Sequence, residues 1–208
     1  DTVALMKGLL AKNKPAMVMG YWIGGMPGVP WWRVKAQSGG QAVEQTIHTF
    51  DMARYLLGEV KSVQCTWSTG LMTDVPNYDV EDATCVNLQF ESGVCGTIFS
   101  GCFLKGLPGK VGLDIWCQSM RIEYAGRKQV TVLEPEKEPV VTQVGNTPGL
   151  DFDATFMKAV AAAGKDAKAA QAMLKSSYAD ACRSLAVPLA ANESIATGAI
   201  VEPVKFED

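Results

Sequence analysis

The chain has 208 residues, of which 48% are hydrophobic and 20% are charged, and its formal net charge is −3. This composition is typical of a soluble globular domain, and the scattered lysines and arginines form no basic stripe, which excludes nucleic acid as a partner. No stretch approaches the roughly 18 uninterrupted apolar residues that span a bilayer, and the N-terminus has no signal-peptide pattern, so we expect a cytoplasmic protein without membrane contact.

The start of the chain is predicted to run from helix to strand to loop. Apolar residues at helical spacing predict a helix at residues 2–12, Pro15 ends it, and an apolar run at 16–19 predicts a strand. Residues 21–33 are rich in glycine, proline and aromatic residues, which is typical of an ordered loop.

The next segment carries the strongest functional pattern in the sequence. Glu44, the single histidine His48, and Asp51 are spaced so that they fall along one line of a helix. Ser38 and Gln41 have capping-box spacing around a glycine pair and predict where that helix begins. We therefore expect one continuous helix with two acids and an imidazole on a shared stripe.

Two interpretations of this stripe follow from its chemistry. An imidazole titrates near neutral pH, so a neighbouring carboxylate can orient it for proton exchange with a substrate. In the other interpretation, Glu44 and His48 form an ordinary surface pair one turn apart, and Asp51 pairs with Arg54 or Lys61. The spacing alone leaves both open.

The middle of the chain is predicted to be a series of short strands. Segments rich in β-formers lie at residues 61–68, 83–90, 94–103, 111–117, 120–124, 129–133 and 140–144. The short connections at 91–93 and 118–119 suit hairpin turns, so we expect successive strands to be antiparallel neighbours in a meander.

Helical spacing returns at residues 151–163 and 176–197. Helices packed on one face of an open, predominantly antiparallel sheet predict an α+β fold. The strand at 83–90 alternates, with apolar residues on one side and more polar residues on the other. The second sheet face should therefore meet solvent or a second subunit, which predicts a homo-oligomer through the open face.

These motifs, in this order, resemble the C-terminal domain of the Gfo/Idh/MocA oxidoreductase family, whose members include glucose-fructose oxidoreductase and inositol 2-dehydrogenase. The resemblance covers nearly the whole chain. It rests on Ser38-Gly39-Gly40 followed by Glu44, His48 and Asp51, and on the segments at 56–60, 78–96, 177–181 and 190–194. It implies a single substrate-binding and oligomerisation domain at residues 1–208, with an N-terminal NAD(P)-binding Rossmann domain missing from this chain.

The resemblance also implies a reaction. Members of the family move a hydride between nicotinamide and a CH–OH carbon of a sugar, a polyol or a related compound. By resemblance, His48 exchanges a proton with the reacting hydroxyl, and Glu44, where many members have aspartate, orients the substrate or His48. Asp51 is expected to hold the helix behind them.

A second group of candidate residues comes before the glycine pair. Trp31, Trp32 and Arg33 stand where the family has its substrate loop. Indole faces and a guanidinium group suit the stacking and hydrogen bonding of a carbohydrate-like substrate. The alternative is that one of the two tryptophans packs in the core beneath the loop.

The cofactor is expected to be NAD or NADP, bound mainly by the missing domain. The sequence contains no strand followed by G-x-G-x-x-G at the start of a helix, so we predict no cofactor-binding residues here. The six cysteines show no CxxC pair and no second histidine accompanies them, so no metal site is predicted. Alone, the chain should be inactive, and the alternative function is a noncatalytic oligomerisation or ligand-binding module with the same fold.

Overall fold

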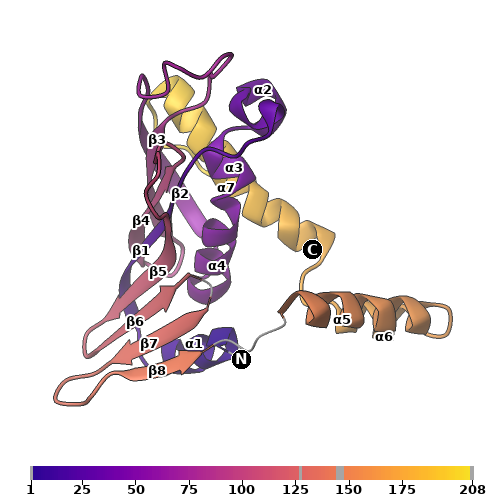
Figure 1. Ribbon diagram of the computed structural model, residues 1–208. Helices are drawn as coiled ribbons and strands as arrows, with labels where there is room; N and C mark the ends of the chain where they lie inside the picture. The colour runs from indigo at the N-terminus through magenta and orange to yellow at the C-terminus, as the bar shows by residue number, and fades with distance from the viewer. Residues whose placement is uncertain (1, 127, 144–147, 207–208) are drawn as a thin grey trace.

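The computed structural model of the chain describes residues 2–126, 128–143 and 148–206. Its centre is one eight-stranded sheet with the order β2-β3-β4-β1-β5-β6-β7-β8 (Figure 1). The strands are β1 (Pro15–Ile23), β2 (Val60–Ser68), β3 (Ala83–Phe90), β4 (Cys95–Gly101), β5 (Lys110–Cys117), β6 (Met120–Ala125), β7 (Gln129–Leu133) and β8 (Val140–Gln143). The predicted open and predominantly antiparallel sheet is confirmed, although Val144, the last residue of one predicted strand, lies outside the described residues.

The predicted meander is wrong at one place, because β1 lies between β4 and β5. It pairs in parallel with β4 and antiparallel with β5. A Cβ atom at Gly96 would lie 2.5 Å from the carbonyl oxygen of Val18, so glycine at this position lets β1 approach β4 closely. The order of segments along the chain could not reveal that the first strand enters the centre of the sheet.

The helices and the 3₁₀ helix η1 follow the predicted regions in outline. They are α1 (Thr2–Leu10), η1 (Pro30–Arg33), α2 (Lys35–Ser38), α3 (Gln41–Glu44), α4 (Ile47–Leu57), α5 (Pro148–Ala163), α6 (Ala167–Met173) and α7 (Tyr178–Thr197). In Figure 1, α1, α4 and α7 lie on the same side of the sheet. Phe50 and Ala53 of α4 and Val187 of α7 are buried in one core cluster with strand residues such as Ile98 and Ile115. This packing fixes α4, which carries His48, against the middle of the sheet.

The single helix predicted across residues 41–57 is wrong, since α3 ends at Glu44 and α4 begins at Ile47. The N–H of Thr46 reaches back five residues to the carbonyl of Gln41 at 3.1 Å, which interrupts the regular four-residue pattern. The Gln41 side chain makes two hydrogen bonds. The Cys102 thiol donates to Gln41 Oε1 at 2.5 Å, and Gln41 Nε2 donates to Gln45 Oε1 at 3.2 Å. The contact with Cys102, which lies far away along the chain, stabilises α3 as a separate turn.

The predicted capping box is also wrong. Ser38 ends α2, and its Oγ accepts the N–H of Gly40 at 3.0 Å instead of capping the first turn of a helix beginning at Gln41. Gly39 and Gly40 have φ values of 75° and 89°, which L-residues with side chains rarely adopt. The glycine pair therefore reverses the chain between two short helices.

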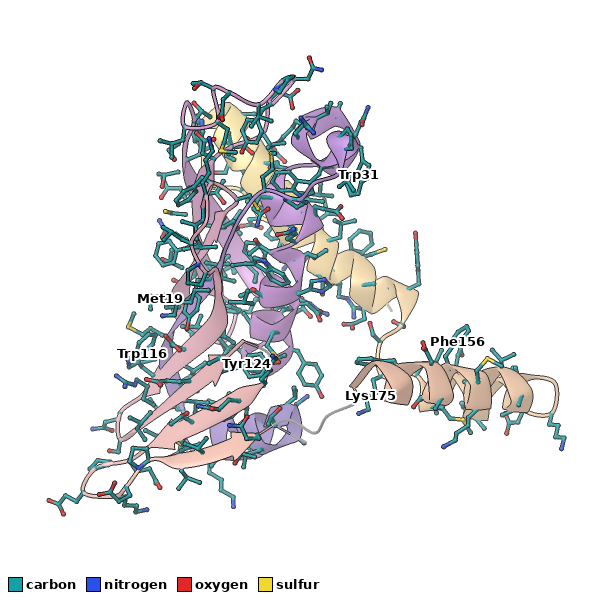
Figure 2. All side chains as sticks on the ribbon, viewed as in Figure 1. Met19, Trp31, Trp116, Tyr124, Phe156 and Lys175 are labelled. Carbon is teal, nitrogen blue, oxygen red and sulfur yellow. The ribbon has the colours of Figure 1, made fainter. Side chains whose placement is uncertain are left out.

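The other face of the sheet is open. Asn87 and Gln89 are exposed there, whereas their neighbours along β3 are buried, as the alternation predicted. Figure 2 shows Met19 and Trp116 on this side, away from the helices. Met17, directly opposite Trp116 in the sheet, is 46% exposed.

Helices α5 and α6 pack mainly on each other and extend away from the sheet (Figure 1). The side chains of Phe152 and Met157 are 71% and 64% exposed, and Phe156, labelled in Figure 2, is 57% exposed. The described chain thus leaves an apolar helical surface uncovered. None of the helices in the described residues has the length and hydrophobicity of a membrane-spanning segment.

Candidate active site

His48 is the second residue of α4, and its side chain is exposed. Its imidazole lies beside the indole of Trp22, near the end of β1, with ring centroids 5.7 Å apart and planes tilted by 33°. Among the described residues, neither imidazole nitrogen has a hydrogen-bond partner. The ring is therefore supported on one face, and its nitrogens are available to a ligand.

Glu44 lies on a different helical turn from His48 because of the break between α3 and α4. Its carboxylate is exposed, and within the described part of the chain no hydrogen bond or ion pair joins it to His48. The continuous stripe predicted from helical spacing is absent. Glu44 and His48 come from successive short helices, and both side chains are exposed.

Asp51 belongs to a cluster centred on Arg54. Ser184 Oγ donates a hydrogen bond to the Asp51 carboxylate, and Arg54 Nη2 lies 3.7 Å from the same oxygen. Arg54 is only 6% exposed and pairs with Glu59 at 2.7 Å and with Asp180 of α7. In this structure Asp51 therefore helps to hold α4 against α7.

The structure separates the two tryptophans of η1. Trp32 is 1% exposed and packs with Val80 and Cys102 in a small second core, so the prediction that it binds substrate is corrected. Trp31, labelled in Figure 2, is 43% exposed on the outer side of the same turn. Arg33 is half-buried, and its Nη1 donates to the carbonyl of Pro76 at 3.5 Å. Successive side chains of a 3₁₀ turn point about 120° apart, so Trp32 can pack in this core while Trp31 faces solvent.

A charged cluster that the sequence did not reveal surrounds the glycine pair. Lys35 Nζ lies 2.5 and 2.7 Å from the two carboxylate oxygens of Glu81 and 2.9 Å from Oδ1 of Asn192. Asn192 Nδ2 donates to the carbonyl of Gly39 at 2.8 Å. A Cβ at Gly40 would lie 3.2 Å from both Glu81 and Lys35. The 78–96 and 190–194 segments of the family resemblance contain Glu81 and Asn192, but no pattern linked them to Lys35, because the partners lie far apart along the chain.

Tyr21, next to Trp22, points to the opposite face of the sheet and takes no part in this site. Burial, followed by the negative charges of Asp114 and Glu123, raises the pKa of Tyr21 to about 12. Lys110 lies 4.4 Å from the centre of the same ring. The alternation of a strand thus places two adjacent aromatic residues in different environments.

The side chain of His48 is exposed. Two cavities of about 230 and 300 Å³ lie elsewhere, one lined by residues between 69 and 80 and the other between α1 and α4. Neither is lined by His48, Glu44 or Trp31. No cluster of three or more histidine, cysteine or acidic side chains that could hold a metal ion occurs in the described ranges.

The glycine-rich segment at residues 24–28 does not have the geometry of a pyrophosphate-binding turn. The glycines that follow β1 lead into η1, a four-residue 3₁₀ helix, whereas a pyrophosphate site needs a glycine-rich turn that opens an α-helix. The one parallel strand pair that the structure describes, β1 with β4, is not joined by a short crossover of that kind.

Comparison with known proteins identifies the domain. Residues 14–123 match the family described as the GFO/IDH/MocA C-terminal domain. The chain belongs to this family. The family resemblance seen in the sequence is thereby confirmed, and the site described above lies almost entirely within the matched residues.

Solved structures share the fold of this GFO/IDH/MocA domain. Levoglucosan dehydrogenase in complex with NADH has a TM-score of 0.77 and 20% identity, covering 98% of this chain and 63% of that structure. The same enzyme in complex with NADH and L-sorbose has a TM-score of 0.78 and 18% identity, covering 98% of this chain and 62% of that structure. An NAD-binding oxidoreductase from Klebsiella pneumoniae has a TM-score of 0.76 and 16% identity, covering 98% of this chain and 63% of that structure.

At these identities the likeness concerns the fold, and the chain spans about 63% of the length of the levoglucosan dehydrogenase chain. None of the curated proteins matches the sequence. The proteins that share the fold are described as dehydrogenases or oxidoreductases, so the GFO/IDH/MocA domain is one found in nicotinamide-dependent enzymes.

Proposed function

We propose that this domain is the substrate-binding and catalytic half of an NAD(P)-dependent oxidoreductase acting on a CH–OH group of a sugar, a polyol or a related compound. The observation that carries the proposal is the open position of His48, the single histidine, on a GFO/IDH/MocA domain. Structures with the same fold that are described as complexes with levoglucosan or L-sorbose support the substrate class.

In this proposal His48 exchanges a proton with the reacting hydroxyl through one of its open nitrogens. Glu44, one turn earlier, binds a neighbouring substrate hydroxyl, since its carboxylate has no partner among the described residues. Trp31 offers an exposed indole face and Arg33 a guanidinium group at the rim, both suited to a polyhydroxylated ligand. The nicotinamide supplies the redox chemistry from outside this domain.

We propose that a separate Rossmann domain of the same polypeptide binds the cofactor. Two observations support this: the chain spans 63% of the length of levoglucosan dehydrogenase, and the exposed apolar side chains of α5 lack a partner surface in the described residues. Packing a second domain against Phe152 and Met157 would remove that apolar surface from water.

Calorimetry with NADH and NADPH tests whether the cofactor binds to a separate domain. The 208-residue chain is expected to bind neither nucleotide, because it lacks a glycine-rich turn at a helix N-terminus. A longer polypeptide that includes the upstream coding sequence is the matched control, and it should bind one of them. Tight binding by the 208-residue chain would contradict the proposal and redirect attention to the glycines at residues 24–28.

We also propose that the open sheet face forms a homo-oligomer. Met17, which is 46% exposed, lies opposite Trp116 on this face, and a second subunit would cover this apolar surface. Met17→Asp should convert an oligomer to a smaller species in light scattering. Leu189→Asp is the control, because Leu189 on α7 is 48% exposed against 46% for Met17. A monomer at high concentration for the unaltered chain would count against this proposal.

A further inference from the structure

The orientation of the His48 ring has a structural cause that differs from the one the sequence suggested. The family resemblance predicts that Glu44 orients the substrate or His48, but the helix break separates the two residues, and no hydrogen bond or ion pair joins them among the described residues. The aromatic contact with Trp22, 5.7 Å between ring centroids, is the side-chain interaction of His48 in the described structure.

Trp22 sits on a rigid part of the sheet. It lies opposite Ser100 of β4 and Val111 of β5, so its backbone is paired on both sides. The alternation along β1 directs Trp22 to the same face as Val18, which is buried in the core beneath the helices. An indole held in this position can restrict the rotation of a side chain on α4.

The distance between α4 and β1 is set by a glycine two residues before Trp22. A Cβ at Gly20 would lie 2.7 Å from Cγ2 of Thr49, the residue after His48, so only glycine lets the first turn of α4 come this close. Because Thr49 is packed down onto Gly20, its neighbour His48 is held at a defined height beside Trp22.

We propose that Trp22 is the positioning residue of His48. The indole limits rotation of the imidazole and leaves both nitrogens free at the ring edge for the reacting hydroxyl. The catalytic consequence rests on the proposed role of His48 in proton exchange, whereas the positioning itself does not. Aromatic pairs in offset or tilted arrangements are favourable contacts, which supports a single preferred ring orientation.

Nuclear magnetic resonance of the 208-residue chain tests the positioning directly, because His48 is its single histidine and its ring signals need no assignment. The ring protons should be shifted upfield by the indole, and the side-chain couplings should indicate one χ1 rotamer. Trp22→Leu should remove the upfield shift and give averaged couplings, and Trp22→Phe should restore much of both. Trp67→Leu is the control, since Trp67 is on the edge strand β2 with two strands between it and β1.

Kinetics of the longer polypeptide give a second readout, with kcat calculated from the folded fraction of each variant so that a folding defect is not counted as a loss of catalysis. Trp22→Leu should lower kcat by about 10- to 100-fold with a smaller change in KM, the loss typical of a misplaced catalytic group, and Trp22→Phe should recover most of it. Trp67→Leu should match the unaltered enzyme.

The outcomes separate this inference from the proposed function. His48 signals unchanged by Trp22→Leu, or a kcat unchanged by it while His48→Ala is impaired, would overturn the positioning role alone. Full activity in His48→Ala would overturn the proposed catalytic role of His48, and the ring signals would still decide whether Trp22 orients it.

Discussion

His48→Ala, in a polypeptide carrying both this domain and its cofactor-binding domain, should lower turnover by about 10²- to 10⁴-fold, the usual effect of removing a positioned acid or base. In the proposed mechanism, removing the one imidazole of the domain leaves the reacting hydroxyl without the group that takes its proton. Because the side chain is exposed and contributes little to the core, the fold should be unaffected.

Steady-state oxidation of a sugar or polyol with NAD or NADP measures this effect. Nucleotide affinity serves as the internal control, because the cofactor should bind to a different domain and remain unaffected. His48→Gln is the matched variant: it retains a hydrogen-bonding side chain but cannot exchange protons in this pH range, so it should be as impaired as alanine. Unchanged turnover in either variant would remove His48 from the mechanism.

Arg54→Met should destabilise the fold, because it breaks the ion-pair cluster that holds α4 against α7. Arg54 is 6% exposed, yet it pairs with Glu59 and Asp180 and donates from Nε to Ser184 at 3.1 Å. Methionine fills much of the volume but leaves both carboxylates without their cation. Breaking a buried ion pair costs about 3–5 kcal/mol, and because both acids are partly exposed we expect about 3 kcal/mol.

Urea unfolding of the 208-residue chain measures the loss as a fall in the transition midpoint. Lys105→Met is the matched control, because Lys105 pairs with Asp74 at 2.8 Å where the two side chains are 61% and 65% exposed. Solvent screens such a pair, so its midpoint should be almost unchanged. Equal midpoints for the two variants would mean that the Arg54 cluster does not hold α4 to α7.

The ion pair between Arg54 and Asp180 should make the loss of stability caused by Arg54→Met dependent on pH. Burial tends to raise the pKa of Asp180, but hydrogen bonds from Arg54 and Ser176 and the charges of Arg54 and Arg183 outweigh it, so this pKa lies below its ordinary value. A lowered carboxyl pKa stabilises the fold above the unfolded value, about 3.9, and the contribution disappears as the pH falls through the folded value. The stability gap between Arg54→Met and the unaltered chain should therefore narrow in acid.

Much of the fold followed from local patterns. The strands predicted at residues 83–90 and 129–133 coincide with β3 and β7, because alternation and short polar turns are properties of neighbouring residues. The α+β class followed from the order of these segments. The glycine pair, Glu44 and His48 also marked the family, and they could be read from one stretch of sequence.

Other features depended on residues that lie far apart in the chain. At the break in the helix containing Glu44 and His48, Gln41 is held by Cys102, 61 residues away, and a helical repeat carries no information about that contact. Trp32 is buried by Val80 and Cys102, although Trp31 beside it is exposed.

The sequence by itself determined which residues have the chemistry for proton exchange and ligand binding, because residue type and short-range periodicity are local. Only the tertiary structure decided which of them meet. The insertion of β1 between β4 and β5 places Trp22 under α4, and Gly20 allows the close approach that sets the indole beside His48. Such a contact between a strand and a helix is decided by long-range packing, where the burial of the whole core outweighs the preferences of any single segment.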